Sequence, residues 1–253
     1  MEIEKGLKLS DVSFWVDNVA TKKKQKIIDR CSLHIQPGEF VSFHGKSGCG
    51  KTTLMNLISG LIAPSSGKIF LDGKEVLSPS KEIAFVFQES ALYPYLTIRQ
   101  NIELGMRLNG ISAEDRKKRA DELLCKVGLS EHAHKYPVRD KLSGGMKQRA
   151  EIASVLADES KVIIMDEPFG ALDDQTREEM QLLILQVWRD FQKIILFITH
   201  NKTEALLLSD KVVLMPSRNG DSYREVSIDL PRPRNDLQSE FMEYRKKLHD
   251  HLK

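Results

Sequence analysis

A glycine-rich run with one lysine and two threonines carries the clearest chemistry in this sequence. The run fits the pattern G-x-x-x-x-G-K-[ST] and consists of Gly45, Lys46, Ser47, Gly48, Cys49, Gly50, Lys51, Thr52 and Thr53. Glycines let the backbone turn tightly, so that consecutive N–H groups point at phosphate oxygens. In such a loop the lysine reaches the β- and γ-phosphates and the first threonine hydroxyl binds Mg²⁺. The run therefore predicts that Lys51 and Thr52 bind a nucleoside triphosphate with its Mg²⁺.

The segments on either side of this run support the prediction. Residues 39–44 are β-rich, and residues 52–61 carry apolar side chains at helical spacing. A phosphate loop lies between a strand and a helix, and the helix N-terminus adds the positive end of its dipole. An ordinary glycine-rich turn is the alternative, and this context favours the phosphate loop.

Two adjacent carboxylates follow an apolar run further along the chain. Residues 162–165 read as a buried strand, and Asp166 and Glu167 come directly after it. Ligands of α/β proteins bind at the carboxyl ends of the parallel strands. There, Asp166 would hold Mg²⁺ through water, and Glu167 would polarise the water that attacks the γ-phosphate. A solvated strand end gives the same pattern, but the phosphate loop in the same chain favours the catalytic interpretation.

A serine and two glycines open a helical run within the stretch LSGGMKQR, residues 142–149. Ser143, Gly144 and Gly145 would form a second helix N-terminus that binds an anion. The simpler alternative is that Ser143 only caps the helix. Because the chain has one phosphate loop, a second γ-phosphate contact implies that another copy of the protein closes over the nucleotide.

The hydrophobic pattern predicts the elements that position these residues. We expect strands at 7–16, 27–34, 39–44, 68–71, 162–165, 194–198 and 211–215. We expect helices at 52–61, 98–108, 113–127, 145–157 and 176–191, and weak helical character from residue 235 onward. Strands that alternate with helices imply a largely parallel sheet with crossover helices, and residues 96–157 read as a helical insertion.

Composition excludes several classes of protein. The 253 residues include 38 Lys+Arg and 36 Asp+Glu, a formal net charge of +2 that gives no broad basic surface for nucleic acid. Three separate cysteines form neither a disulfide framework nor a zinc site, which favours a reducing compartment. The N-terminus lacks the apolar core of a signal peptide, and no apolar run approaches the ~18 residues of a membrane helix.

Taken in order, these motifs resemble those of the ATP-binding subunits of ABC transporters. LSGGMKQR is similar to the signature motif of that family and is more specific than the phosphate loop. Three further residues stand at family motifs: Gln88 at the Q-loop, Asp173 at the D-loop and His200 at the switch histidine. The resemblance covers about residues 7–234. It implies a P-loop NTPase (RecA-like) α/β core with a mainly parallel sheet and an inserted α-helical subdomain.

The resemblance also implies domain boundaries and roles. A single ABC ATPase domain would span residues 1–253, with the core at 1–90 and 158–234, the helical subdomain at 91–157 and a short tail at 235–253. Gln88 would contact Mg²⁺ and the attacking water and would sense the membrane partner. His200 would hold the γ-phosphate and keep Glu167 placed, and Asp173 would span the dimer interface. The cofactors implied are ATP and Mg²⁺.

Some positions depart from the family pattern. An aromatic ring usually stacks on adenine, but Val16 stands at that position, and strand alternation would point the neighbouring Trp15 to the other face unless the strand bulges. Trp15 as a packing residue and Trp15 as the adenine contact are both open. Asn201 replaces a common Asp, and residues 151–156 lack a common Arg.

Three stretches resemble the nitrate/sulfonate/taurine importer branch of the family: residues 169–173, 204–210 and 229–234. This resemblance implies a second copy of the chain, an integral-membrane permease and an extracytoplasmic solute-binding protein as partners, and no nucleic acid. The chain would lie at the cytoplasmic face of the inner membrane as a peripheral subunit. The alternatives are the motor of an exporter and a soluble ABC ATPase that acts on a non-membrane assembly or repair partner.

The cysteines carry a prediction of their own. Cys49 lies inside the phosphate loop beside a helix N-terminus, which predicts a depressed thiol pKa and solvent access. A bulky adduct on Cys49 would occupy phosphate space. Cys31 and Cys125 read as packing residues.

Overall fold

The computed structural model describes residues 5–18, 23–87, 91–170, 172–216 and 222–250. The chain forms two compact units. The first unit comprises Met1–Ser80 and Phe191–Lys253, and the second comprises Lys81–Asp190. Within the described ranges, no helix is both long and apolar enough to cross a lipid bilayer.

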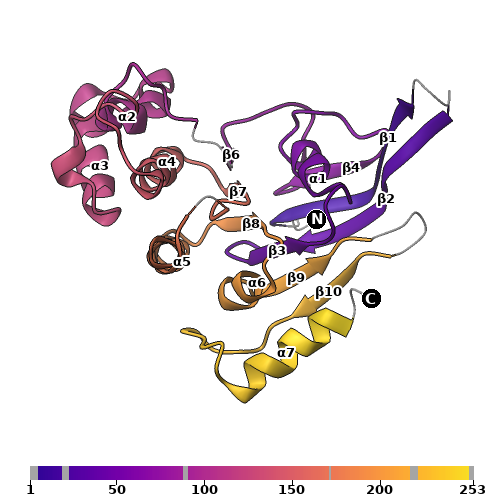
Figure 1. Cartoon of the computed structure of the whole chain (residues 1–253). Helices are drawn as coiled ribbons and strands as arrows, with labels where there is room; N and C mark the ends of the chain where they lie inside the picture. Colours follow the sequence, from indigo (N-terminus) through magenta and orange to yellow (C-terminus); the bar gives the residue numbers. More distant parts are fainter. Residues whose placement is uncertain (1–4, 19–22, 88–90, 171, 217–221, 251–253) are drawn as a thin grey trace. The chain divides into compact units, whose positions relative to one another are not determined.

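An antiparallel sheet in the order β2-β1-β4-β5 lies in the first unit (Figure 1). Its strands are β1 (Leu7–Asn18), β2 (Lys23–Ile35), β4 (Ser66–Leu71) and β5 (Lys74–Glu75). The register between β1 and β2 shifts at three places, between Leu9 and Val12, between Val12 and Phe14, and between Phe14 and Trp15. The simple alternation of side chains along β1 is therefore broken next to Trp15.

The first unit also contains neighbouring strands in the order β10-β9-β3-β8. They are β3 (Phe40–His44), β8 (Ile194–Ile198), β9 (Lys211–Leu214) and β10 (Arg224–Ser227). β3 is parallel to both β8 and β9, while β10 is antiparallel to β9. Every residue of β3 and β8 is buried, as expected for parallel strands covered on both faces.

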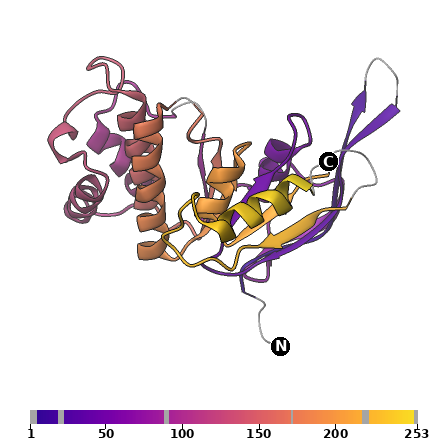
Figure 2. The same cartoon turned by 60° about the horizontal axis from the view of Figure 1, so that its bottom comes forward.

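Three helices belong to the first unit: α1 (Lys51–Ile58), α6 (Lys202–Leu208) and α7 (Ser239–Asp250). Phe241 and Leu248 lie two turns apart on one face of α7 and are fully buried. They pack in one apolar cluster with Leu206 of α6 and Leu214 of β9. Figures 1 and 2 show α7, in yellow, running beside α6 and the β9–β10 pair. The tail is therefore part of the core of the first unit.

The second unit combines a parallel strand pair with helices. The strands are β6 (Ile83–Val86) and β7 (Val162–Asp166). The helices are α2 (Ile98–Leu108), α3 (Ala113–Lys126), the 3₁₀ turn η1 (Ser130–His132), α4 (Gly144–Ala157) and α5 (Asp174–Phe191).

Capping residues explain why these helices begin where they do. Thr97 and Gln100 form a reciprocal capping box at the start of α2, and Ser112 accepts a hydrogen bond from the backbone N–H of Asp115 in the first turn of α3. These polar side chains satisfy N–H groups that have no partner within the helix. The predicted helices and strands are confirmed to within a few residues. The short elements β5, β6, α6 and β10 were not predicted.

Candidate nucleotide-binding and hydrolysis site

The phosphate loop follows β3 directly, and its tip is open to solvent. Gly45 is buried, whereas Lys46, Ser47 and Gly48 are exposed. Lys51, only 9% exposed, turns back over the loop, and its Nζ donates to the carbonyl oxygens of Gly45 (2.8 Å) and Lys46 (3.1 Å). The ammonium group is thus held along the inner side of the loop.

The N-terminus of α1 presents backbone donors beside that lysine. Gly50 is the N-cap residue with a left-handed φ of 99°, a conformation that strongly favours glycine. Among the described residues, no side chain caps this end of α1 and no acidic residue lies in its first turn. The first N–H groups of a helix have no internal acceptor, so they are suited to bind an anion. The Thr52 side chain in this turn is exposed and Thr53 is half-buried.

His200 lies at the same edge of the parallel strands as the phosphate loop. β3 and β8 are parallel and Phe43 pairs with Ile198, so Gly45 and His200 both follow the carboxyl ends of neighbouring strands. His200 is exposed, while Thr199 before it is buried. The first unit thus brings Lys51 and His200 to one edge of its parallel strands.

A network of hydrogen bonds holds the turn that carries His200, and it gives Asn201 a physical role. The Asn201 side-chain oxygen accepts from the backbone N–H groups of Thr203 (2.9 Å) and Glu204 (3.4 Å), which caps α6. Its amide nitrogen faces the buried Glu204 carboxylate at 3.5 Å, and that carboxylate also accepts from the Thr199 hydroxyl at 2.5 Å. An aspartate at position 201 would place a second negative charge beside Glu204.

The ring of Trp15 is half-buried, and Val16 is 40% exposed. The Lys24 ammonium lies 5.3 Å from the centroid of the Trp15 ring. Because the register shifts between Phe14 and Trp15, the alternation argument against Trp15 does not hold. An adenine contact by Trp15 stays a prediction.

In the second unit, Asp166 is the last residue of β7 and Glu167 follows it, and both are half-buried. Glu167 has a φ of 47°, a left-handed conformation that is uncommon for a residue with a side chain. Val86 of β6 pairs with Met165 of β7, so the chain leaves both strands at the same edge. The residue predicted to contact Mg²⁺ next to this edge, Gln88, lies outside the described residues.

The signature segment begins α4. The Ser143 hydroxyl accepts from the backbone N–H of Met146 at 3.2 Å, so Ser143 is the N-cap, and it is exposed together with Gly144. Gly145 is buried, and a Cβ atom there would stand 2.5 Å from the Cγ2 atom of Thr176. A residue with a side chain at position 145 would therefore require the Thr176 side chain to shift.

Thr176, the neighbour of Gly145, also connects this segment to Asp173. The Asp173 carboxylate accepts from the Thr176 backbone N–H (2.9 Å) and hydroxyl (2.8 Å), and these bonds lower the pKa of Asp173. Asp173 is exposed at the start of α5. The second unit thus brings the signature glycines and Asp173 together through one threonine.

Two buried residues of α4 that were not predicted as site residues contact loops next to predicted site residues. Buried Gln148 donates to the carbonyl oxygen of Pro168, next to Glu167. Glu151, 5% exposed, accepts from the backbone N–H of Ala91 at 3.3 Å. The signal in the sequence was the presence of Glu151 among apolar residues of a predicted helix, because a buried glutamate is rare without a polar partner.

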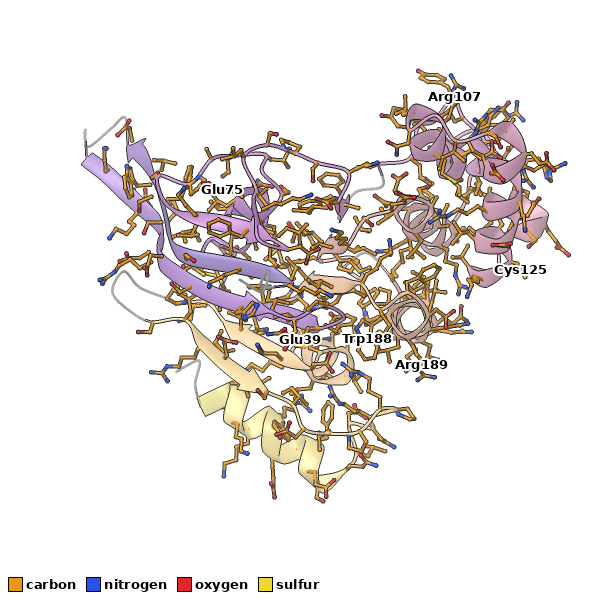
Figure 3. All side chains as sticks on the ribbon, turned by 180° about the vertical axis from the view of Figure 1, so that it is seen from behind. Glu39, Glu75, Arg107, Cys125, Trp188 and Arg189 are labelled. Atoms are coloured by element: carbon orange, nitrogen blue, oxygen red, sulfur yellow. The ribbon has the colours of Figure 1, made fainter. Side chains whose placement is uncertain are left out.

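The structure corrects the predictions for two cysteines. Burial raises the pKa of the Cys49 thiol above its ordinary value, and the nearby Lys51 only partly offsets this, so the predicted depressed pKa is wrong. Cys125 is exposed in the last turn of α3, so its packing role is also wrong (Figure 3). Cys31 is buried, as predicted.

The predicted site residues occur in both units. The first unit holds the phosphate loop and His200, and the second holds Asp166, Glu167, the signature segment and Asp173. A hydroxyl on Thr52 and a carboxylate on Asp166 are oxygen ligands of the kind that Mg²⁺ prefers, with the remaining ligands coming from phosphate and water. Among the described residues, no group of three or more His, Cys, Asp or Glu side chains is placed to hold a metal by itself. Each of these oxygen donors, taken by itself, suits a metal that arrives with the nucleotide.

A phosphate loop between a parallel strand and a helix, with acidic residues at a strand end, defines a P-loop NTPase. Residues 28–170, more than half of the chain, match the family model described as ABC transporter. The chain belongs to this family and is an ABC-type ATP-binding subunit, an ATPase. It carries the mixed α/β fold of ABC cassettes.

Three relatives illustrate the match. The chain is 46% identical over 200 residues to the nitrate import ATP-binding protein NrtD of Synechocystis sp., which covers 79% of this chain and 74% of that protein. It is 43% identical over 220 residues to the taurine import ATP-binding protein TauB of Jannaschia sp., covering 87% and 81%. The dimeric ATP-binding cassette MJ0796, in a post-hydrolysis state with ADP and Pi, superimposes with a TM-score of 0.76 at 30% identity, covering 89% of this chain and 100% of that one.

Proposed function

We propose that this chain hydrolyses ATP to drive a membrane permease that imports a small anion such as nitrate, a sulfonate or taurine. One observation carries the hydrolytic part: parallel strands β3 and β8 deliver the phosphate loop and His200 to the same sheet edge. The solute class is supported by the likeness to nitrate and taurine import subunits.

Each residue of the first unit has a role in binding ATP. Lys51 exchanges its two loop carbonyls for oxygens of the β- and γ-phosphates, while the N–H groups of Gly45–Thr53 and the N-terminus of α1 surround the phosphates. Thr52, Asp166 and Gln88 would hold Mg²⁺, which neutralises the phosphate charge when bound.

Hydrolysis needs a positioned water. Glu167 polarises the water that attacks the γ-phosphate, and His200 contacts that phosphate and keeps Glu167 in place. Glu167 has a left-handed backbone conformation, and such strained residues cluster at active sites, which supports this role.

A second copy of the chain completes the site. Ser143 and Gly144 are exposed at the N-terminus of α4, where they can meet the γ-phosphate bound to the partner copy. Asp173, exposed beside them, would contact the same partner. The proposed assembly therefore contains two nucleotides, each held between the phosphate loop of one copy and the signature segment of the other.

Exposed aromatic side chains in the second unit support a membrane partner. Tyr93 is 58% exposed and Tyr95 is 89% exposed, shortly after Gln88 in the chain. The Tyr93 backbone is bonded to α2, because buried Asn101 accepts from the Tyr93 backbone N–H at 2.7 Å and donates to its carbonyl oxygen at 3.2 Å. Exposed aromatic groups are typical of contacts with another protein. We place the permease here, which would hold the chain at the cytoplasmic face of the inner membrane. An extracytoplasmic solute-binding protein would complete the importer.

The test of the catalytic proposal is Glu167→Gln, with Glu178→Gln of the exposed face of α5 as matched control. The amide keeps the shape of the side chain but loses the charge that polarises water, so turnover should fall by at least about 100-fold while ATP still binds and the dimer persists. Steady-state hydrolysis and gel filtration with ATP measure the two effects. Hydrolysis near the wild-type rate in Glu167→Gln would remove Glu167 from this role.

The solute is tested in cells that carry either variant. Uptake of labelled nitrate, taurine or an alkanesulfonate should stop with Glu167→Gln and continue with Glu178→Gln. Two results together would contradict the importer proposal: uptake of all three solutes at wild-type rates in cells that carry Glu167→Gln, and no membrane protein co-purifying with the chain from detergent extracts. The proposed ATPase activity would be unaffected by these results.

A further inference from the structure

Gln148 is a buried polar residue that the proposed mechanism does not use. It lies on α4, the helix that begins with the signature segment, one turn after Gly144, and it is 8% exposed. Its amide nitrogen donates to the backbone carbonyl oxygen of Pro168, a residue that is also buried. A buried amide without an acceptor is costly, so this bond fixes the Gln148 side chain on one carbonyl.

The turn that accepts this bond carries Glu167. The turn is closed by the N–H of Gly170, which donates to the Glu167 carbonyl at 3.1 Å. Phe169 within it is 2% exposed, so the turn is anchored in the apolar interior. Pro168 has no N–H, so its carbonyl is its main-chain hydrogen-bonding group, and Gln148 binds that group. The bond therefore reaches the residue directly after the proposed catalytic carboxylate.

The backbone conformation of Glu167 needs support from its surroundings. Its φ of 47° is left-handed, which is unfavourable for a residue with a side chain. Such a conformation persists only where the neighbouring structure holds it. On the N-terminal side, Met165 of β7 is held by its pairing with Val86 of β6. On the C-terminal side, the bond from Gln148 to Pro168 holds the chain.

The face of α4 that carries Gln148 lies along the same segment of chain. Gly144 and Gly145 precede Gln148 by four and three residues, so the three positions share one face of the helix. A Cβ atom on Gly144 would stand 3.7 Å from the Cδ2 atom of Leu172. A Cβ atom on Gly145 would stand 2.5 Å from the Cγ2 atom of Thr176. To these close approaches Gln148 adds a directed hydrogen bond, next to Glu167.

We propose that Gln148 is a positioning residue for hydrolysis, which holds the turn carrying Glu167 against α4. This inference rests on the proposed role of Glu167 as the residue that polarises the attacking water. Because its bond ends on a backbone carbonyl, Gln148 acts on the turn and not on the substrate. Its loss should slow the chemical step, while ATP binding by the phosphate loop stays nearly unchanged.

The test compares Gln148→Met with a matched control in the full-length protein. Methionine is similar in length to glutamine, suits a buried position and has no donor. Ser154→Ala is the control, because Ser154 lies on the same helix and its hydroxyl also donates to a backbone carbonyl, that of Ala150, at 2.9 Å. We expect kcat to fall about tenfold in Gln148→Met with KM for ATP within about twofold, and both constants to stay within about twofold in Ser154→Ala.

Equal losses of kcat in Gln148→Met and Ser154→Ala would overturn the proposal, since they would trace the effect to the stability of α4. A raised KM for ATP with unchanged kcat would overturn it as well, because the defect would then lie in nucleotide binding. If Gln148→Met is not recovered folded, Gln148→Ala replaces it. Alanine also lacks the donor, so the same loss of kcat is expected. Wild-type turnover in the folded variant that lacks the donor would contradict the proposal.

A double-mutant cycle with Glu167→Gln separates this inference from the proposed function. In single-turnover hydrolysis, Gln148→Met should add less than about twofold to the loss caused by Glu167→Gln, because both act through one carboxylate. A full further loss of about tenfold would show that Gln148 acts elsewhere and would overturn the inference alone. Wild-type turnover in Glu167→Gln would overturn the role of Glu167 and the inference with it.

Discussion

At the scale of single residues, the buried carboxyl of Glu151 gives a stability signature that depends on pH. Burial raises its pKa from an ordinary 4.5 to about 7, despite the bonds from the Ala91 and Phe87 backbones that favour the charged form. The folded state thus holds a proton that the unfolded state releases between these values. Its contribution to stability is present below pH 4.5 and is lost as pH rises to 7.

We therefore expect Glu151→Gln to remove this slope. The free energy of unfolding of the variant relative to wild type should rise by roughly 2–3 kcal/mol between pH 5 and pH 8, since one pKa unit corresponds to about 1.4 kcal/mol. Urea unfolding at a series of pH values measures this difference, with the exposed Glu178→Gln as control for loss of a carboxylate. A difference that stays flat with pH would contradict a buried, proton-binding Glu151.

The three thiols should differ sharply in reactivity. Cys125 is exposed, whereas burial raises the pKa of Cys31 to about 12 and raises that of Cys49. We expect one fast-reacting thiol per chain with a thiol-disulfide reagent at pH 8, abolished by Cys125→Ser, and a slow second reaction at Cys49 that MgATP delays. Fast labelling that persists in Cys125→Ser would contradict this order.

The residue types and their spacing predicted which residues bind phosphate, but not how deeply the neighbouring ionisable groups are buried. The spacing of Lys51 and Thr52 predicts a phosphate loop because backbone geometry dictates that pattern. The raised pKa of Glu151 depends on burial by segments far away in the chain, which spacing does not encode. The same reason explains the error at Cys49: the helix N-terminus suggested a low pKa, and desolvation reversed it.

At the scale of elements, the branch-specific stretches 204–210 and 229–234 contact each other. The Arg234 guanidinium donates to the carbonyls of Leu206 (2.6 Å) and Ser209 (2.5 Å) at the end of α6, and to those of Ile228 and Leu230. Arg232 pairs with Asp210 at 2.5 Å. The stretches that resemble the nitrate and taurine branch thus include Arg232 and Arg234, which bind the C-terminal end of α6, the helix that follows His200. We call these two arginines the clamp.

Removing this clamp should destabilise the first unit. Arg234→Ala leaves four carbonyl oxygens without this donor, and we expect a loss of about 3 kcal/mol in the free energy of unfolding. Arg224→Ala, on the exposed strand β10, is the matched control and should change it by less than about 0.5 kcal/mol. Urea titration followed by circular dichroism compares them, and equal effects of the two substitutions would contradict the clamp.

Element prediction succeeded where local signals were strong. Helix α2 was predicted with its observed bounds from its amphipathic pattern, and the structure shows a capping box at Thr97 where that pattern begins. Strands β6 and β10 have four residues each and exist because β7 and β9 pair with them. Such pairing depends on tertiary structure, so short runs of sequence give little sign of it.

At the scale of the whole molecule, we propose that each nucleotide lies between two copies of the chain. Lys51→Ala removes the γ-phosphate cation, and Ser143→Arg fills the anion-binding N-terminus of α4 with a long side chain. In a homodimer, either substitution damages both sites. In a mixed dimer, both substitutions fall in one shared site, and the other site is entirely wild type.

The most direct measurement is vanadate trapping of labelled nucleotide in a mixture of these two inactive proteins, after subunit exchange has been verified with differently tagged chains. We expect the mixture to trap nucleotide at about one site per mixed dimer, well above either parent alone. Trapping no greater than in the parents, despite proven exchange, would contradict the shared site and leave Ser143 as a helix cap only.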